Sequence, residues 1–180
     1  MTRSRKLGLD CLTPILWSKI SNGATEVEGN GAGFYGKPYQ PGAIAKNDFE
    51  YILFLRKGGA YRSPTAMQRA LSVLTKPEMQ QWLRTCWTDV KGESTRNGHP
   101  APYPVEIAER LIRLFSFVGD TVLDPFAGTA TTSIAAMRLG RNSIANELEP
   151  KYVTLAKQRM CNEQSAVPLL DCFDVRFIKA

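Results

Sequence analysis

The chain has 180 residues, of which 43% are hydrophobic and 22% charged, and its formal net charge is +6. This length suits one domain with a sizeable core and is short for two, and the composition is ordinary for a globular protein. No apolar run approaches the roughly 20 residues that cross a bilayer, and no apolar signal core follows the basic N-terminus, so we expect a cytoplasmic protein without membrane association, whose charge permits a nucleic-acid partner.

The first half of the chain has an irregular pattern rich in glycine, proline and aromatic residues. Residues 13–20 predict a short buried strand, and the glycine-rich residues 22–41 predict a loop. Residues 49–56 form the strongest strand candidate, because they are dense in apolar and aromatic side chains and end before two glycines. Further along, Thr75-Lys-Pro-Glu is typical of a helix start, so a helix is predicted over 75–83.

The second half shows a clean alternation of helix and strand patterns. It predicts, in order, a helix from Pro104, a strand at 121–124, a tight turn at 125–129, a helix at 131–139 closed by Gly140, a strand at 142–147 and a helix from Pro150. Strands that alternate with helices in this way run parallel and are joined by right-handed crossovers. The predicted fold class is therefore α/β with a mainly parallel sheet.

The turn after the strand at 121–124 has the sequence Asp124-Pro-Phe-Ala-Gly-Thr-Ala-Thr-Thr132. Ligands of open α/β sheets sit beyond the carboxyl ends of the strands, so this turn is a candidate binding site. Gly128 would let the backbone come close to a ligand, and Asp124 could bind a cationic or hydroxyl-bearing group. Hydroxyl groups that could also cap the following helix come from three threonines, Thr129, Thr131 and Thr132.

A second acidic residue, Glu147, lies at the end of the next predicted strand. An acid about 20 positions after a glycine turn can accept hydrogen bonds from ribose hydroxyls, which suggests a nucleoside-containing cofactor. Glu149 is the competing residue, but it should fall in the turn before Pro150. A turn that serves packing alone is the other interpretation. A nicotinamide dinucleotide is disfavoured, because the Gly-x-Gly-x-x-Gly pattern is represented by Gly128 alone.

Three segments together resemble the permuted, β-type DNA amino-methyltransferases, which transfer a methyl group from S-adenosyl-L-methionine to adenine N6 or cytosine N4. Residues 124–132 resemble the cofactor motif of that family, and residues 140–147, with Pro150 and Tyr152, resemble the segment whose acid holds the ribose. His99-Pro-Ala-Pro-Tyr-Pro104 resembles the motif that lines the methionine end of the cofactor and precedes the cofactor motif only in the permuted order.

The resemblance implies a Rossmann-like methyltransferase fold, S-adenosyl-L-methionine as cofactor and double-stranded DNA as partner. The cofactor-binding residues that it implies are Asp124, Pro125, Phe126, Gly128, Thr129, Thr131, Thr132 and Glu147, together with His99, Ala101, Tyr103 and Pro104. Residues 47–56 also resemble strands of the family's catalytic subdomain, and the likeness is weakest between 60 and 85. The implied division is a part of the catalytic subdomain at 1–57, a variable segment that recognises DNA at 58–98, and the cofactor-binding subdomain at 99–180.

Two departures from the family pattern are visible. Ala130 stands where the Phe-x-Gly-x-Gly pattern has its second glycine, and we expect its methyl group to be tolerated on a backbone with negative φ. The family's catalytic motif, Asp/Asn/Ser-Pro-Pro-Tyr/Phe/Trp, binds the target amino group and stacks on the flipped base, but the chain contains no Pro-Pro pair. The nearest imitation, Gly36-Lys-Pro-Tyr39, lacks the polar first residue, so no catalytic residue is assigned.

In the family that the chain resembles, the missing motif follows a central strand beside 121–124. The resemblance therefore implies that this strand is absent, which would leave the sheet incomplete with one unpaired edge. The chain is therefore expected to be a truncated gene product, one half of a split enzyme, or a fold that fills the gap differently. An N-terminal partner polypeptide or a homodimer is the expected assembly.

The leading functional hypothesis is a site-specific DNA methyltransferase. Adenine N6 is favoured as its target, because the glycine loop and the strand with Glu50 look more like adenine enzymes. One alternative is a non-catalytic cofactor- or DNA-binding subunit that completes a partner methyltransferase. An RNA or small-molecule methyltransferase is the weaker alternative.

Basic residues in the weakly matching region are candidates for DNA contact, namely Arg62, Arg69, Lys76 and Arg84. Trp82 and Trp87 could offer stacking surfaces, and the other interpretation is a solvated basic face with tryptophans in the core. No metal is expected, because the single histidine and the four cysteines lack the spacing of a zinc site. We expect reduced cysteines that pack as small apolar residues, at Cys11, Cys86, Cys161 and Cys172.

Overall fold

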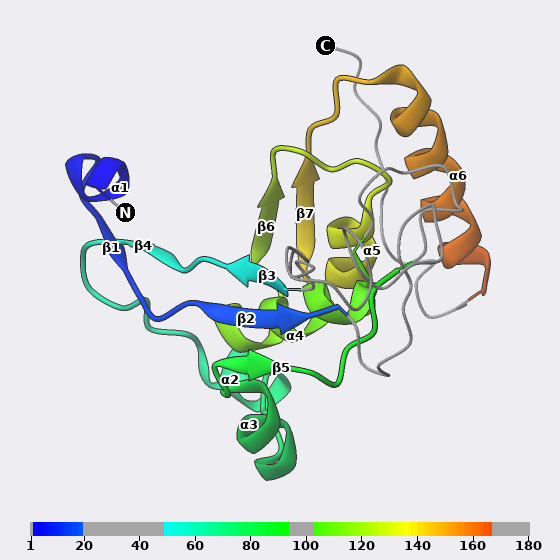
Figure 1. Cartoon of the computed structure of the whole chain (residues 1–180). Coiled ribbons are helices and arrows are strands. Elements are labelled where there is room, and N and C mark those ends of the chain that lie inside the picture. The colour runs from blue at the N-terminus through cyan, green and yellow to red at the C-terminus, as the bar shows by residue number, and fades with distance from the viewer. Residues whose placement is uncertain (1, 20–48, 94–102, 167–180) are drawn as a thin grey trace, which may run out of the picture. The chain divides into compact units, whose positions relative to one another are not determined.

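The computed structural model describes most of the chain, in three ranges, 2–19, 49–93 and 103–166. The chain divides into two compact units (Figure 1). Unit 1 comprises residues 1–62 and 76–92, and unit 2 comprises residues 63–75 and 93–180. No helix within the three described ranges is both long and apolar enough to span a membrane.

Unit 1 contains short elements arranged in two small sheets. In chain order they are α1 (Thr2–Lys6), β1 (Leu9–Cys11), β2 (Ile15–Ser18), β3 (Phe49–Ile52), β4 (Leu55–Lys57), α3 (Lys76–Trp82) and β5 (Cys86–Trp87). One sheet pairs β1 with β4, antiparallel; the other has the order β3-β2-β5, in which β2 runs antiparallel to β3 and parallel to β5. The expectation of a mainly parallel sheet is therefore wrong for this unit.

The outcome of the predictions for unit 1 follows from this pairing. The strand predicted within 13–20 is confirmed as β2, and the helix predicted at 75–83 is confirmed as α3. The strand predicted at 49–56 is interrupted after Ile52, because its two halves pair with different partners, β3 with β2 and β4 with β1. The loop predicted at 22–41 lies outside the described residues.

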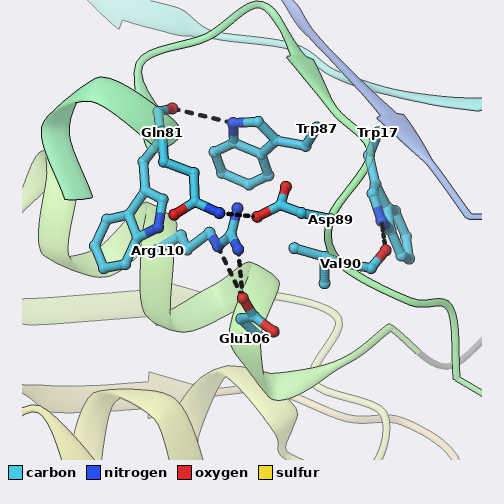
Figure 2. A network of polar contacts seen from close by, with 8 residues as sticks. Trp17, Gln81, Trp87, Asp89, Val90, Glu106 and Arg110 are labelled. Carbon is cyan, nitrogen blue, oxygen red and sulfur yellow. Dashed lines mark hydrogen bonds and ion pairs between the residues drawn. The ribbon is translucent and has the colours of Figure 1, made fainter. Parts of the chain in front are cut away.

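Two tryptophans form the core of unit 1. Trp17 and Trp87 are 2% and 0% exposed. Each indole N–H donates to a backbone carbonyl, Trp17 to Val90 at 2.8 Å and Trp87 to Trp82 at 3.0 Å (Figure 2). These bonds satisfy the polar edge of each indole, so both rings can be buried. Trp87 is therefore a core residue, which agrees with the second of the two interpretations, whereas Trp82 is half-buried.

Unit 2 holds the alternating helices and strands predicted for the second half of the chain. Its elements are α2 (Ala66–Leu71), α4 (Val105–Phe115), β6 (Thr121–Asp124), α5 (Thr131–Arg138), β7 (Asn142–Ala145) and α6 (Pro150–Ala166). β6 and β7 run parallel, with Thr121 opposite Asn142 and Asp124 opposite Ala145. Both strands therefore end at the same edge, and the predicted α/β class is confirmed.

Helix α5 lies at the centre of the core of unit 2, and its Ala135 and Ala136 have no exposed surface. One cluster of buried side chains joins α5 to α4 and to Val122 of β6. A second cluster joins α5 to α6 through Ile134, Met137, Ala156 and Met160, and it includes Ala130. The small side chains of α5 let its neighbours approach closely, so the helix packs beside both strands and both other helices.

The opposite face of the β6–β7 sheet carries two exposed apolar side chains among the described residues. Leu123 and Ile144 are neighbours in the register, and they are 64% and 57% exposed. Among the described residues, β6 pairs with β7 alone. Parallel sheets are normally covered on both faces, whereas the described part of this sheet is covered by helices on the side of Val122.

Helix α2 was not predicted from the sequence. It begins with a capping box, in which the Gln68 N–H donates to Thr65 Oγ1 and the Thr65 N–H donates to Gln68 Oε1, both at 3.1 Å. It is tied to the segment before β6, because Gln68 Nε2 donates to the Val118 carbonyl at 3.2 Å and the Val118 N–H donates to Ser72 Oγ at 2.9 Å. These bonds attach residues 63–75 to unit 2.

The described cysteines carry free thiols. Cys11 is half-buried, with its Sγ 3.2 Å from Ser4 Oγ. The expectation that the cysteines pack as small apolar residues is wrong for Cys86 and Cys161, which are exposed. Successive strand residues point to opposite faces, so the burial of Trp87 turns Cys86 outward. Cys172 lies outside the described residues.

Candidate functional site

The segments that follow β6 and β7 lie against each other. The Asn146 N–H donates to the Asp124 carbonyl, and the Ala127 N–H donates to the Asn146 carbonyl, both at 2.9 Å. These bonds continue the pairing of the two strands beyond their ends. They bring the turn predicted to hold a cofactor beside the acidic segment that begins at Asn146.

The Glu147 carboxylate joins the two segments directly. Its Oε2 accepts the backbone N–H of Gly128 at 2.7 Å, and its Oε1 accepts the N–H of Glu149 at 2.9 Å. The expectation that Glu147 and the glycine turn lie together is confirmed. Glu149, the competing acid, contributes its backbone N–H to this group, and its side chain is exposed.

Asp124 is oriented by a short chain of hydrogen bonds. Its Oδ1 accepts the N–H of Phe126 at 3.0 Å, and its Oδ2 accepts the hydroxyl of Thr132 at 2.5 Å. Tyr103 Oη lies 2.6 Å from Thr132 Oγ1. Since Thr132 gives its one hydroxyl proton to Asp124, Tyr103 must be the donor in the second contact. Burial raises the pKa of Tyr103, so this hydroxyl keeps its proton.

Tyr103 and Pro104 are the described part of the segment predicted to line the methionine end of the cofactor. Pro104 is buried and is the N-cap of α4. Tyr103 reaches the turn through Thr132, as predicted for a segment that shares a site with it. His99 and Ala101, which belong to the same predicted segment, lie outside the described residues.

Ala130 has φ 66° and ψ 29°, so the expectation of a negative φ is wrong. It is the one non-glycine residue with positive φ in the part of the chain that the structure describes. The Ala130 N–H closes the turn on the Ala127 carbonyl at 2.8 Å, and the positive φ of Ala130 then directs the chain into α5. A left-handed conformation costs a residue with a Cβ about 1–2 kcal/mol, so the turn is held against strain.

The expectation that the three threonines of the turn help to cap α5 is wrong. The N-cap is Ala130, which has no side chain that could accept a hydrogen bond. The hydroxyl oxygens of Thr129 and Thr131 instead accept from Arg159, and the hydroxyl of Thr132 donates to Asp124. The threonines therefore fix the turn to its surroundings.

Arg159 of α6 is a site residue that the sequence did not reveal. Its Nη1 donates to the Thr129 carbonyl at 2.7 Å and to Thr129 Oγ1 at 2.5 Å, and lies 3.2 Å from Thr131 Oγ1. Nothing in the local pattern of α6 separates this arginine from the other charged residues of that helix. The contact between Arg159 and the turn, which is distant in sequence, can be recognised only in the three-dimensional structure.

Two large apolar side chains are left almost fully exposed at the site. Phe126 is 87% exposed and Leu148 is 97% exposed. Phe126 lies two positions before Gly128, and Leu148 directly follows Glu147, so each of the two joined segments contributes one of them. Exposed apolar surface beside a carboxylate and backbone N–H groups is typical of ligand sites, which combine apolar walls with few polar contacts.

The basic residues predicted to contact DNA are exposed, but they are divided between the two units. Arg62, Lys76 and Arg84 belong to unit 1, and Arg69 belongs to unit 2. Arg84 Nε also donates to the Gln80 carbonyl at 3.2 Å. Neither unit gathers all four residues, so their contact with DNA stays a prediction.

A glycine turn after one parallel strand, bonded to a carboxylate after the next, defines an α/β protein of the class that binds nucleoside cofactors. The family model of the N6/N4 DNA methylases matches residues 3–158. The chain therefore belongs to the DNA methylase family.

Two type II methyltransferases are similar in sequence to this chain. The type II methyltransferase M.MthZI of Methanothermobacter thermautotrophicus is 40% identical over 162 residues, which are 85% of this chain and 44% of the relative. The type II methyltransferase M.MjaI of Methanocaldococcus jannaschii is 38% identical over 180 residues, which are 96% of this chain and 56% of the relative. The chain thus spans about half the length of these relatives.

The fold is also similar to that of a DNA methylase of known structure. A candidate DNA modification methylase of Thermus thermophilus, in complex with S-adenosyl-L-methionine, is 47% identical and superposes with a TM-score of 0.71. The match covers 90% of this chain and 57% of that protein. The α/β architecture is therefore that of DNA methylases.

Proposed function

We propose that unit 2 binds S-adenosyl-L-methionine at the turn 124–132 and Glu147, and that the chain is the cofactor-binding part of a DNA amino-methyltransferase. The hydrogen bond between Gly128 and Glu147 is the observation that carries this proposal, because it joins the two segments that would share the nucleoside. The Thermus protein, 47% identical, holds the same cofactor, which supports the choice of ligand.

Each polar group of the site has a role in this proposal. The Glu147 carboxylate would accept hydrogen bonds from the ribose hydroxyls. Asp124, held by Thr132, would bind the positively charged or hydroxyl-bearing side of the ligand. Phe126 and Leu148 would lose exposed apolar surface against the nucleoside, which contributes to affinity.

The cofactor supplies a methyl group on a positively charged sulfur when it is bound. The chain's own residues would hold the cofactor in one orientation, and this preorganisation supplies much of the acceleration of an in-line transfer. A target base must leave the DNA stack to reach such a site, because its amino group is otherwise paired. DNA is therefore the proposed substrate, and adenine N6 is the favoured target.

The group that would bind the target amine is not recognisable in these 180 residues, which contain no Pro-Pro pair. We propose that a separate polypeptide segment supplies it and adds a strand beside β6. The exposed side chains of Leu123 and Ile144 support this assignment, since they form the apolar surface that such a segment would cover. The position of Tyr103 and Pro104 ahead of the turn supports the permuted motif order.

Equilibrium dialysis against methyl-labelled S-adenosyl-L-methionine tests the cofactor assignment. We expect saturable binding that S-adenosylhomocysteine displaces and that a nicotinamide dinucleotide leaves unchanged. Failure of the folded chain to retain label, or displacement by the dinucleotide, would reject the assignment.

Methyl transfer to DNA tests the wider proposal. The chain would be assayed alone and after mixing with a segment that carries an Asp-Pro-Pro-Tyr-type motif from a relative. Transfer only in the mixture would support a split methyltransferase. Cofactor binding without transfer in either assay would favour the alternative, a non-catalytic subunit.

A further inference from the structure

Arg159 contacts the turn on both sides of its strained residue. The carbonyl and hydroxyl of Thr129, just before Ala130, accept from its Nη1, and the hydroxyl of Thr131, just after Ala130, lies 3.2 Å from the same nitrogen. Arg159 itself is half-buried on α6, a helix that contributes no residue to the turn. The arginine therefore links a separate helix to the two residues that flank Ala130.

The conformation of Ala130 depends on the two peptide groups that Arg159 restrains. The angles φ and ψ of a residue set the orientation of the peptide before it relative to the peptide after it. Fixing the Thr129 carbonyl and the Thr131 side chain limits that orientation from both ends. Without such restraint an alanine would favour negative φ, because its Cβ makes the left-handed region unfavourable.

A relaxed Ala130 would also move the N–H of Gly128. Helix α5 is held in the core by Ile134 and Met137, so a change of φ at Ala130 would swing the preceding turn relative to that helix. Gly128 belongs to that turn, which the Ala130 N–H closes on the Ala127 carbonyl at 2.8 Å. The Gly128 N–H is the group that meets the Glu147 carboxylate. The geometry of the predicted nucleoside site thus depends on the angle at Ala130.

We propose that Arg159 is a positioning residue, which holds Ala130 in the left-handed conformation and so keeps the cofactor turn formed before the ligand arrives. This inference rests on the proposed function for the identity of the ligand. Preformed sites bind more tightly because less ordering remains to be done on binding. Arg159 would therefore act on affinity through the turn, without touching the cofactor.

Three variants of the purified chain separate this role from general packing. Arg159→Met removes the donor and keeps a long side chain, and Ala130→Gly removes the penalty for positive φ. Arg138→Met is the matched control, because Arg138 also joins α5 to α6, through Glu163, and its hydrogen bonds go to Glu163 and Glu109, which lie outside the turn. Each substitution would be made alone, and the first two would also be combined.

The first measurement needs no ligand. Amide hydrogen exchange over residues 125–132 should be at least about fivefold faster in Arg159→Met, the change expected when a hydrogen bond to a charged group is lost from a local structure. Exchange in the double variant with Ala130→Gly should return toward that of the parent chain. Equal exchange in Arg159→Met and Arg138→Met would overturn the proposal.

The second measurement is the affinity for S-adenosylhomocysteine by calorimetry. Arg159→Met should weaken it about tenfold, while the double variant should recover to within about threefold, because glycine adopts the left-handed region without help. Purely additive effects of the two substitutions would contradict the proposal. If the parent chain takes up no ligand, the proposed function fails, and the exchange measurement still decides whether Arg159 positions the turn.

Discussion

The backbone N–H of Gly128 donates to the Glu147 carboxylate across 2.7 Å, although 19 residues separate them in the sequence. The contact is possible because β6 and β7 are adjacent, parallel and in register up to Asp124 and Ala145. Segments that leave such strands emerge at one edge of the sheet, where ligands of open α/β sheets bind. The bond therefore marks the place where we propose that this chain holds a nucleoside.

Glu147→Gln should weaken the binding of S-adenosylhomocysteine by about 10- to 100-fold, the range expected for the loss of hydrogen bonds to a charged acceptor. Glutamine also replaces one carboxylate oxygen by an NH₂ group, which is a donor. If that group faced the Gly128 N–H, two donors would meet and the hydrogen bond would be lost. Calorimetric titration measures the change. Glu149→Gln is the matched control and should bind within about twofold of the parent chain, since Glu149 joins the site by its backbone. Similar losses in both variants would show that Glu147 has no special role.

Thr132→Val should lower the same affinity by about three- to tenfold, because it leaves Asp124 Oδ2 without its hydroxyl donor. Tyr103→Phe should have a smaller effect, since Tyr103 reaches Asp124 only through Thr132. In a double-mutant cycle, the combined variant should therefore match Thr132→Val alone. Two independent, additive losses would contradict a linear chain of hydrogen bonds.

The elements of unit 2 from α4 to α6 could be predicted because each of their signals is local in sequence. Pro104 precedes the first turn of α4, and Gly140, with φ 68°, follows the end of α5. Strand β6, between these two helices, has a short apolar pair, Val122-Leu123. The approach of Gly128 and Glu147 could also be predicted, because parallel strands place the segments that follow them at one edge.

The features that could not be predicted depend on residues far apart in the chain. Arg159 donates to the carbonyl of Thr129, 30 positions earlier in the chain, and no sequence pattern in α6 indicates that contact. The positive φ of Ala130 is imposed by the turn around it, against the preference of the residue itself. In unit 1, the two-residue strand β5 is too short to have a pattern, and only its pairing with β2 defines it.

Arg141→Met should reduce the free energy of unfolding by about 2–3 kcal/mol, the cost of leaving buried acceptors without a partner. Arg141 is 4% exposed, and its guanidinium donates to the Ser116 carbonyl at 2.9 Å and to the Leu139 carbonyl at 2.6 Å. Burial lowers the pKa of Arg141 without removing its charge at neutral pH. Urea unfolding measures the change, and Lys151→Met, at an exposed position, should stay within about 0.5 kcal/mol of the parent. An unchanged midpoint in Arg141→Met would contradict a structural role.

Glu163→Gln should make the chain less stable at pH 7 by about 0.5–1 kcal/mol, the value of a partly exposed ion pair. Its carboxylate accepts two bonds from Arg138, at 2.5 and 2.9 Å, and this hydrogen bonding lowers the pKa of Glu163. A carboxyl group with a lowered folded-state pKa stabilises the fold above its ordinary pKa and loses that effect as the pH falls through the folded value. The difference between the two chains should therefore shrink as the pH falls below the ordinary pKa of a glutamate and vanish below the lowered folded-state pKa. Urea unfolding across this range measures it, and a difference that is independent of pH would exclude the ion pair as its cause.

Amide hydrogen exchange of the purified chain, with and without S-adenosylhomocysteine, tests most directly whether the turn and Glu147 form one ligand site. We expect slower exchange over 124–132 and 146–149 that saturates with ligand concentration. Unchanged exchange in both segments of a folded chain at high ligand concentration, or protection confined to other residues, would contradict it.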